Sequence, residues 1–138
     1  MDREAIKAIL PHREPMLLLD EVELQGDKAV GHYTVRGDEF FLQGHFPGRP
    51  IVPGVLLCEM MAQTACLLIQ APVGSFMTYY TGLDHVKFKK PVLPGETIVL
   101  ESQLTAQRGV FYFVQSQGTV DGKLCVSGEL SFAVIAEA

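Results

Sequence analysis

The feature that most constrains the fold is the segment from Val55 to Gln70, which is apolar around nearly its whole circumference. Pro53, a favoured first-turn residue, precedes it, and no helix breaker follows until Pro72. The pattern predicts one helix of about four to five turns. A helix that is apolar on every side must be enclosed by other structure. Its few polar side chains share one stripe, made of Glu59, Gln63, Cys66 and Gln70.

Most of the remaining chain has the pattern of β-strands. A hairpin is expected from segments 16–24 and 29–35 around the turn Gly26-Asp27, after a short helical turn over residues 6–10. Sequential strands joined by short turns predict an antiparallel sheet, which would wrap around the helix. The expected fold class is α+β, in one domain over residues 1–138. Four further strands are predicted, over 76–89, 97–107, 110–119 and 124–135.

Composition narrows the function. Hydrophobic residues make up 48% and charged residues 20%, as in a folded globular chain. The net charge is 11 − 16 = −5, which disfavours a nucleic-acid partner. The three cysteines form no CxxC pair and indicate neither a disulfide framework nor a metal site. No targeting signal is predicted. No membrane span is predicted either, because Glu59 and Gln63 interrupt the longest apolar stretch. A cytoplasmic location is therefore expected.

Two side chains stand out as candidates for acid–base chemistry. Glu59 is a carboxylate on an otherwise apolar helix, and His45 lies in a loop held rigid by prolines and glycines. Each has a purely structural alternative. Glu59 could accept backbone hydrogen bonds or pair with a cation such as Arg49, and His45 could simply bond to loop backbone. Three other histidines show that the residue type alone means little, namely His12, His32 and His85.

The order of these parts along the chain favours catalysis. Backbone N–H groups at the start of the helix, near Gly54 and Val55, can bind a carbonyl oxygen as it becomes negative. The neighbouring carbon then becomes acidic enough for His45 to deprotonate. Glu59, expected to stay protonated in apolar surroundings, could give its proton to a departing hydroxyl. The predicted reaction is a β-elimination.

The same residues resemble the bacterial (3R)-hydroxyacyl-[acyl-carrier-protein] dehydratase family of the dissociated type II fatty acid synthase. The resemblance implies a hot-dog fold and a homodimer with shared active sites, in which His45 of one subunit faces Glu59 of the other. Members also assemble as trimers of dimers, and neither a cofactor nor a metal is implied. Gly54 would donate its N–H to the thioester carbonyl, and Gln63 would support Glu59. The motifs that carry it are Leu10-Pro11-His12-Arg13, Asp20, the run from Gly44 to Pro50, Pro53-Gly54-Val55-Leu56, Glu59, Met61-Ala62-Gln63, Gly82-Leu83-Asp84, Phe88, Pro91-Val92 and Pro94-Gly95.

The implied activity is reversible dehydration of (3R)-hydroxyacyl-acyl carrier protein to the trans-2-enoyl product, with Phe46 and Val55 also contacting substrate. Cys58, Met60 and Cys66 stand where the family pattern commonly shows Ile, Ala and Gly, and these departures leave the acyl chain length open. The alternatives are a bifunctional dehydratase and trans-2 to cis-3 isomerase, a hot-dog acyl thioesterase, and a non-catalytic acyl-carrier binding module.

Two further groups of residues have both a functional and an ordinary interpretation. Basic side chains could dock the acidic carrier protein or be solvated strand-edge charges. Aromatic side chains on the strands could line an acyl tunnel or belong to the core. The basic candidates are Lys87, Lys89, Lys90, Arg108 and Lys123, and the aromatic ones are Phe76, Tyr79, Tyr80, Phe111 and Phe113.

Overall fold

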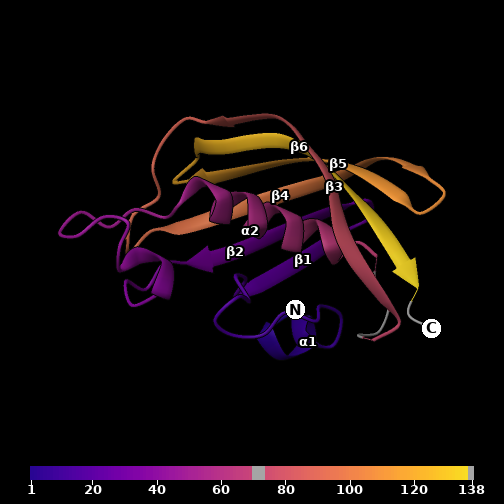
Figure 1. Cartoon of the computed structure of the whole chain (residues 1–138), viewed down its shortest axis with the longest axis horizontal. Helices are drawn as coiled ribbons and strands as arrows, with labels where there is room; N and C mark the ends of the chain where they lie inside the picture. Colours follow the sequence, from indigo (N-terminus) through magenta and orange to yellow (C-terminus); the bar gives the residue numbers. More distant parts are fainter. Residues whose placement is uncertain (70–73, 137–138) are drawn as a thin grey trace.

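The structure, a computed structural model, describes residues 1–69 and 74–136 (Figure 1). Two helices, one 3₁₀ turn and six strands make up this part of the chain. In chain order they are α1 (Arg3–Lys7), β1 (Glu21–Gln25), β2 (Lys28–Thr34), the 3₁₀ turn (Phe40–Leu42), α2 (Gly54–Cys66), β3 (Phe76–Phe88), β4 (Thr97–Arg108), β5 (Phe111–Val120) and β6 (Lys123–Ala136).

The strands form one antiparallel sheet in the order β1-β2-β4-β5-β6-β3. The sheet curves over α2, as Figure 1 shows, and α2 packs against β2, β4, β5 and β6. The predicted α+β class, with one long helix wrapped by an antiparallel sheet, is confirmed. β3 occupies the edge beyond β6 although it comes earlier in the chain than the central strand β4.

Apart from the start of β1, the predicted strand bounds agree with the structure to within one residue, because the turns between strands have clear signals. Gly26 has φ of 65°, and the turn between β5 and β6 has positive φ at both Asp121 (51°) and Gly122 (76°). Such paired positive φ values match the right-handed twist of a hairpin. β1 is shorter than predicted, and α1 lies earlier, over Arg3–Lys7, where Asp2 caps it through the Ala5 N–H.

Helix α2 begins at Gly54 and ends at Cys66, so it is shorter than predicted; Gln70 of the predicted stripe lies outside the described residues. Every residue from Leu57 to Cys66 except Glu59 is buried. The buried hydroxyls find partners: Thr64 donates to the Met60 carbonyl, and Ser102 of β4 donates to the Met61 carbonyl. The helix is therefore held on the sheet by apolar packing with its few buried polar groups satisfied.

One glycine explains how closely α2 approaches the sheet. A Cβ atom placed on Gly31 of β2 would lie 2.8 Å from Thr64 Oγ1 and 3.0 Å from Leu19 Cδ2. Any larger residue would push α2 away from β2. Within the described residues, no helix combines the length and apolar character that spanning a membrane would require.

Candidate active site

Glu59 is held by three hydrogen-bonding side chains from three parts of the chain. Gln63, one turn further along α2, donates to Glu59 Oε2 over 3.0 Å, and the Tyr80 hydroxyl of β3 donates to Oε1 over 3.2 Å. His12 Nε2, from the loop after α1, lies 3.2 Å from Oε2. The Glu59 side chain remains 20% exposed, so the carboxylate is held firmly but can still be reached.

Gln63 is well placed to orient this carboxylate. Its side chain is buried, its Oε1 accepts the Leu18 N–H over 2.9 Å, and its Nε2 also donates to the Met16 carbonyl over 2.7 Å. Because both ends of the amide have backbone partners, its orientation is determined. The remaining N–H is therefore directed at Glu59, which gives the expected supporting role of Gln63 a physical basis.

His12 is the functional residue that sequence reasoning missed. It is the basic side chain that contacts Glu59 among the described residues, where Arg49 was considered instead. Its Nδ1 atom is buried and has no hydrogen-bond partner within residues 1–69 and 74–136. The available signal was its place in the Leu10-Pro11-His12-Arg13 motif, since no periodicity connects it to α2.

The charge state of Glu59 differs from the one expected from sequence. Burial alone would raise the pKa of this carboxyl, as predicted. Hydrogen bonds from His12, Gln63 and Tyr80 and the charge of protonated His12 favour the ionised form, and together they lower the pKa below its usual value. Glu59 in this single chain is therefore a carboxylate at neutral pH, and the expectation of a protonated acid is wrong for it. The surroundings of the Glu59 carboxyl are more polar than the apolar helix sequence predicts.

A pocket of about 160 Å³ opens beside Glu59, between α2 and β3. Cys66 lies within it, and burial raises the pKa of its thiol to about 11, so the thiol stays protonated. Tyr79 and Tyr80, two of the aromatic candidates for a tunnel, line the pocket. Its full lining is His12, Glu59, Ala62, Gln63, Cys66, Thr78, Tyr79, Tyr80 and Phe132.

His45 is positioned by the loop between the 3₁₀ turn and α2. Its Nδ1 lies 3.0 Å from the Ile51 carbonyl oxygen, and its ring stacks on Phe46 with centroids 4.1 Å apart. A carbonyl can only accept, so Nδ1 carries the proton and Nε2 keeps its lone pair for use as a base. His45 is not among the residues that line the pocket of Glu59 in the same chain. The Phe46 ring is 52% exposed.

The start of α2 has the features expected of a carbonyl-binding site. Pro53 is its N-cap residue, and no side chain caps the helix. A Cβ atom on Gly54 would lie 2.8 Å from Phe88 Cε1, so glycine here permits close packing of an aromatic ring. The Val55 side chain is 74% exposed. The N–H groups of this first turn thus lie at a partly exposed apolar surface made by Val55 and Phe88.

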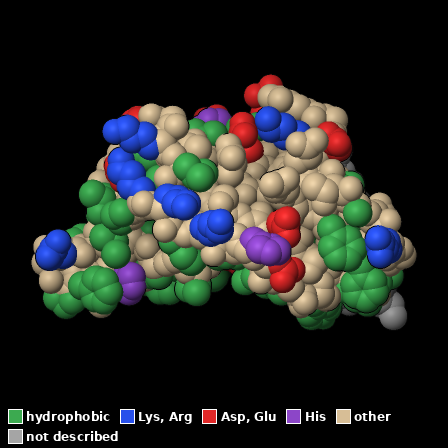
Figure 2. Space-filling view, turned by 90° about the horizontal axis from the view of Figure 1, so that it is seen from above, with side chains coloured by type: hydrophobic (Ala, Val, Ile, Leu, Met, Phe, Trp, Pro, Cys, Tyr) green, Lys and Arg blue, Asp and Glu red, His purple; other side chains and the backbone are tan. Residues whose placement is uncertain are grey.

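The predicted basic residues divide into two places. Lys87 of β3 pairs with Ser127 of β6, and the Lys89 and Lys90 N–H groups donate to the Cys125 carbonyl at the same end of the sheet. Arg108 is linked through Phe111 of β5 to Ala133, which is 133 − 127 = 6 positions further along β6. This separates Arg108 from the lysines by roughly 20 Å. Figure 2 shows a row of Lys and Arg side chains over one half of the face it presents.

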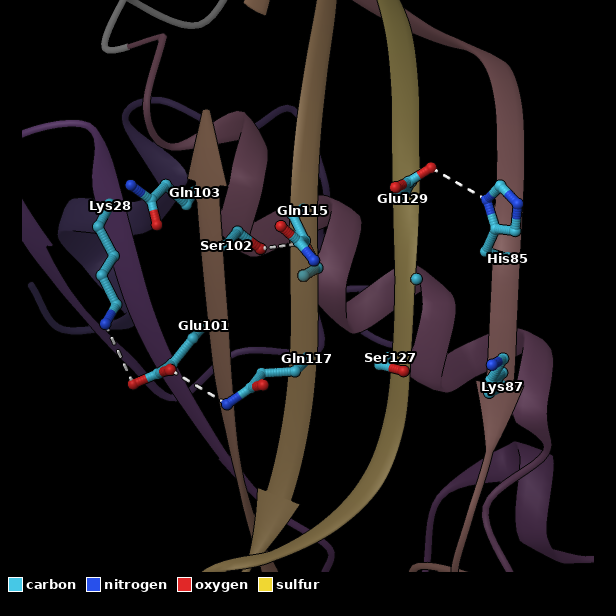
Figure 3. A pocket seen from close by; sticks show the side chains of 12 residues that line it. Lys28, His85, Lys87, Glu101, Ser102, Gln103, Gln115, Gln117, Ser127 and Glu129 are labelled. Atoms are coloured by element: carbon cyan, nitrogen blue, oxygen red, sulfur yellow. Dashed lines mark hydrogen bonds and ion pairs between the residues drawn. The ribbon is translucent and has the colours of Figure 1, made fainter. Parts of the chain in front are cut away.

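A larger pocket, of about 360 Å³, lies on the face of the sheet that points away from α2. Figure 3 shows polar side chains of five strands in front of the sheet, with α2 behind it. Two pairs of side chains contact each other there: Lys28 lies 3.5 Å from Glu101, and His85 lies 3.1 Å from Glu129. Neither His45 nor Glu59 borders this pocket. Among the described residues, no group of three His, Cys, Asp or Glu side chains could hold a metal ion.

Comparison with solved structures agrees with this architecture. A chain of the dehydratase heterocomplex ApeI:P from Xenorhabdus doucetiae matches with a TM-score of 0.80 and 23% identity, covering 93% of this chain and 89% of that one. A hypothetical thioesterase from Streptococcus pneumoniae, solved with coenzyme A, matches with a TM-score of 0.67 and 13% identity, covering 85% and 86%. At these identities the likeness establishes the fold, the hot-dog arrangement.

Sequence comparison goes further. Residues 10–129 match the FabA-like domain. The 3-hydroxyacyl-[acyl-carrier-protein] dehydratase FabZ of Streptococcus gordonii is 43% identical, covering 97% of this chain and 98% of the relative. The protein of the same name from Clostridium perfringens is 44% identical over 97% and 99%. The chain therefore belongs to the FabZ family of 3-hydroxyacyl-[acyl-carrier-protein] dehydratases, which are hydro-lyases.

Proposed function

We propose that this protein catalyses the reversible dehydration of (3R)-hydroxyacyl-acyl carrier protein to trans-2-enoyl-acyl carrier protein in fatty acid biosynthesis, with His45 and Glu59 as the catalytic residues. The observation that carries the proposal is the carboxylate of Glu59, held by three donors at the border of a small pocket. A carboxylate costs free energy to bury, and a purely structural helix position would not need one. No cofactor takes part in the proposed reaction.

In the proposed mechanism, His45 and Glu59 act at neighbouring carbons of the substrate. His45 removes a proton from C2, and Glu59 gives a proton to the hydroxyl group on C3. The Nε2 atom of His45 takes the proton from C2, because its Nδ1–H is donated to the Ile51 carbonyl. The C3–O bond breaks, the C2–C3 double bond forms, and the leaving hydroxyl takes a proton from Glu59 to depart as water. The Gly54 N–H binds the thioester oxygen while negative charge develops on it.

The working unit of the proposal is a homodimer, one hot-dog domain per subunit. β3 is thirteen residues long and pairs on one side only, with β6, among the described strands. It is an unusually long open edge, and such edges pair with another chain unless they are protected. Its exposed side chains include Tyr79, Leu83 and Phe88. In the proposed dimer, two β3 edges meet, and His45 of one subunit completes the Glu59 pocket of the other. Three such dimers would form the hexamer that the family resemblance implies.

The partner in the proposal is acyl carrier protein, which carries the substrate on phosphopantetheine in the cytoplasm. Lys87, Lys89 and Lys90 provide local positive charge on a chain of net charge −5, and this contrast can steer an acidic partner to one end of the sheet. Arg108 lies at the opposite end of the sheet and is left out of the docking group. Phe46, Val55 and Gly54, at the exposed end of α2, are the proposed contacts for the substrate.

The test compares the dehydration rates of His45 and Glu59 variants with those of variants in another His–Glu pair, His85 and Glu129. We expect His45→Ala and Glu59→Gln each to lower kcat for a 3-hydroxyacyl carrier protein by at least about 10²-fold. Mass spectrometry of the carrier protein follows the loss of water, and a thiol reagent detects hydrolysis. His85→Gln and Glu129→Gln, which disrupt an exposed His–Glu pair on the outer face, should retain wild-type rates. Retained dehydration in either site variant, or thiol release as the main reaction, would contradict the proposal.

A further inference from the structure

Glu59 presents a chemical difficulty for the proposed reaction, on which this inference depends. A general acid must hold a proton when the hydroxyl leaves. The Glu59 carboxyl accepts hydrogen bonds from side chains of the α1 loop, α2 and β3, all of which favour its ionised form. The enzyme therefore needs a proton source next to this carboxylate, and that source must refill Glu59 in each cycle.

The groups that face Glu59 can be compared one by one. Gln63 of α2 does not ionise. The Tyr80 hydroxyl of β3 donates to the carboxylate, and partial desolvation and the charge of Glu59 raise the pKa of that hydroxyl, so it keeps its proton. Burial likewise raises the pKa of the Cys58 and Cys66 thiols on α2. His12 is the remaining neighbour in the same chain, and imidazole is the side chain suited to exchange protons near neutral pH.

The geometry of His12 suits this task. Its Nε2 lies 3.2 Å from Glu59 Oε2, which is hydrogen-bond distance for direct transfer. Its Nδ1 is buried without a partner among the described residues. An imidazolium carries protons on both nitrogens, so the charged form of His12 would leave one N–H buried and unsatisfied. His12 is therefore joined to Glu59 through Nε2, the ring nitrogen that has an acceptor among the described residues.

We propose that His12 is a positioning residue that stores the proton which Glu59 delivers to the leaving hydroxyl, so that the two side chains act as one proton-donating pair. In the resting pair, His12 is an imidazolium and Glu59 a carboxylate. The Nε2 proton moves to Glu59 and then to the hydroxyl, which leaves as water while His45 gains the C2 proton. The pair ends one proton poorer and His45 one proton richer, and exchange with solvent restores both.

His12→Gln separates proton storage from positioning. Glutamine can still present an N–H to Glu59, but it cannot supply a proton. Glu59 must then hold the proton itself, and a carboxyl group does so mainly in acid. We expect kcat/KM at pH 7 to fall by about 10²-fold, and the ratio of variant to wild type to rise as the pH is lowered toward about 5. The His45 loop is the same in both proteins, so its contribution cancels in this ratio.

A purely structural role for His12 predicts a ratio that is constant with pH, and that result would overturn the proposal. Tyr80→Phe is the matched control, because it removes another hydrogen bond to Glu59 but no proton that is released near neutral pH; its ratio to wild type should not rise in acid. Thermal unfolding checks that each variant is folded, and His12→Asn provides a second substitution with the same expectation. If Glu59→Gln is inactive while His12→Gln matches wild type, the proposed function stands and the role of His12 is wrong.

Discussion

Individual residues show where reading the sequence succeeded and where it could not. Glu59 stood out because an isolated carboxylate interrupts an apolar helix, and that signal is local. His12 did not stand out, because its contact with Glu59 joins segments far apart in the chain. The lowered pKa of Glu59 was missed for the same reason: burial can be inferred from a helix pattern, whereas donors from β3 and the α1 loop cannot.

Tyr80 provides a direct check on the charge state of Glu59. Tyr80→Phe removes a hydroxyl that donates to Oε1 and favours the ionised carboxyl. Fewer donors mean that the proton binds more tightly, so we expect the pKa of Glu59 to rise from its lowered value toward 4.5. The measurement is a carbon NMR titration of the glutamate carboxyl groups, with Glu59→Gln identifying the resonance. Tyr112→Phe, whose hydroxyl is bonded to Gln107, is the control and should leave that pKa in place. A pKa that falls in Tyr80→Phe would contradict the hydrogen-bond account.

At the level of elements, hairpins could be predicted and the sheet order could not. The pairs β1·β2, β4·β5 and β5·β6 are joined by short turns with glycine, so each pairing follows from local sequence. β3 is preceded by α2 and followed by the segment 89–96, and connections of this kind allow several positions in a sheet. Its place at the far edge depends on how the sheet covers α2 as a whole. The length of α2 was overestimated because apolar sequence continues past Cys66, where the helix ends.

The contact between α2 and β2 can be tested at Gly31. A methyl group there would lie 2.8 Å from Thr64 Oγ1, so either strand or helix must shift. We expect Gly31→Ala to lower the free energy of unfolding by about 1–3 kcal/mol, measured by denaturant titration. Gly44→Ala, where an added Cβ meets nothing within 4 Å, should change it by less than about 0.5 kcal/mol.

A double-mutant cycle with Thr64 identifies the cause. Thr64→Ala removes the crowding atoms, so Gly31→Ala should cost less in that background than in the wild type. If the cost of Gly31→Ala is the same in both backgrounds, the close approach of Thr64 is not what requires glycine at position 31.

For the whole molecule, the single chain leaves two features incomplete: the pocket beside Glu59 and the outer edge of β3. Glu59 borders a pocket, and His45 of the same chain does not contribute to that pocket's lining. β3 leaves one side of its backbone open along the edge nearest this pocket, through Tyr79 and Tyr80. In the dimer proposed above, a second copy pairs with that edge, extends the sheet and supplies its own His45 loop to the pocket. Sequence indicated the two residues, but their meeting across two chains was implied only by the family resemblance.

Mixed dimers test this meeting directly. In a heterodimer of His45→Ala and Glu59→Gln chains, one site would combine the intact His45 with the intact Glu59, and the other site would have neither. Random pairing in an equal mixture makes half of the dimers mixed, so co-refolding two inactive variants should restore about a quarter of wild-type activity. If His45 and Glu59 of the same chain worked together, the mixture would stay as inactive as its components.

The double variant gives the complementary result. Chains with both substitutions, co-refolded with an equal amount of wild type, spoil both sites of every mixed dimer, because each site takes one residue from the damaged chain. Activity per total protein should then fall to about a quarter of that of wild type, whereas sites contained within single chains would leave about half. The two mixtures change activity in opposite directions from the values expected for independent chains, so misfolding of one variant cannot produce both results.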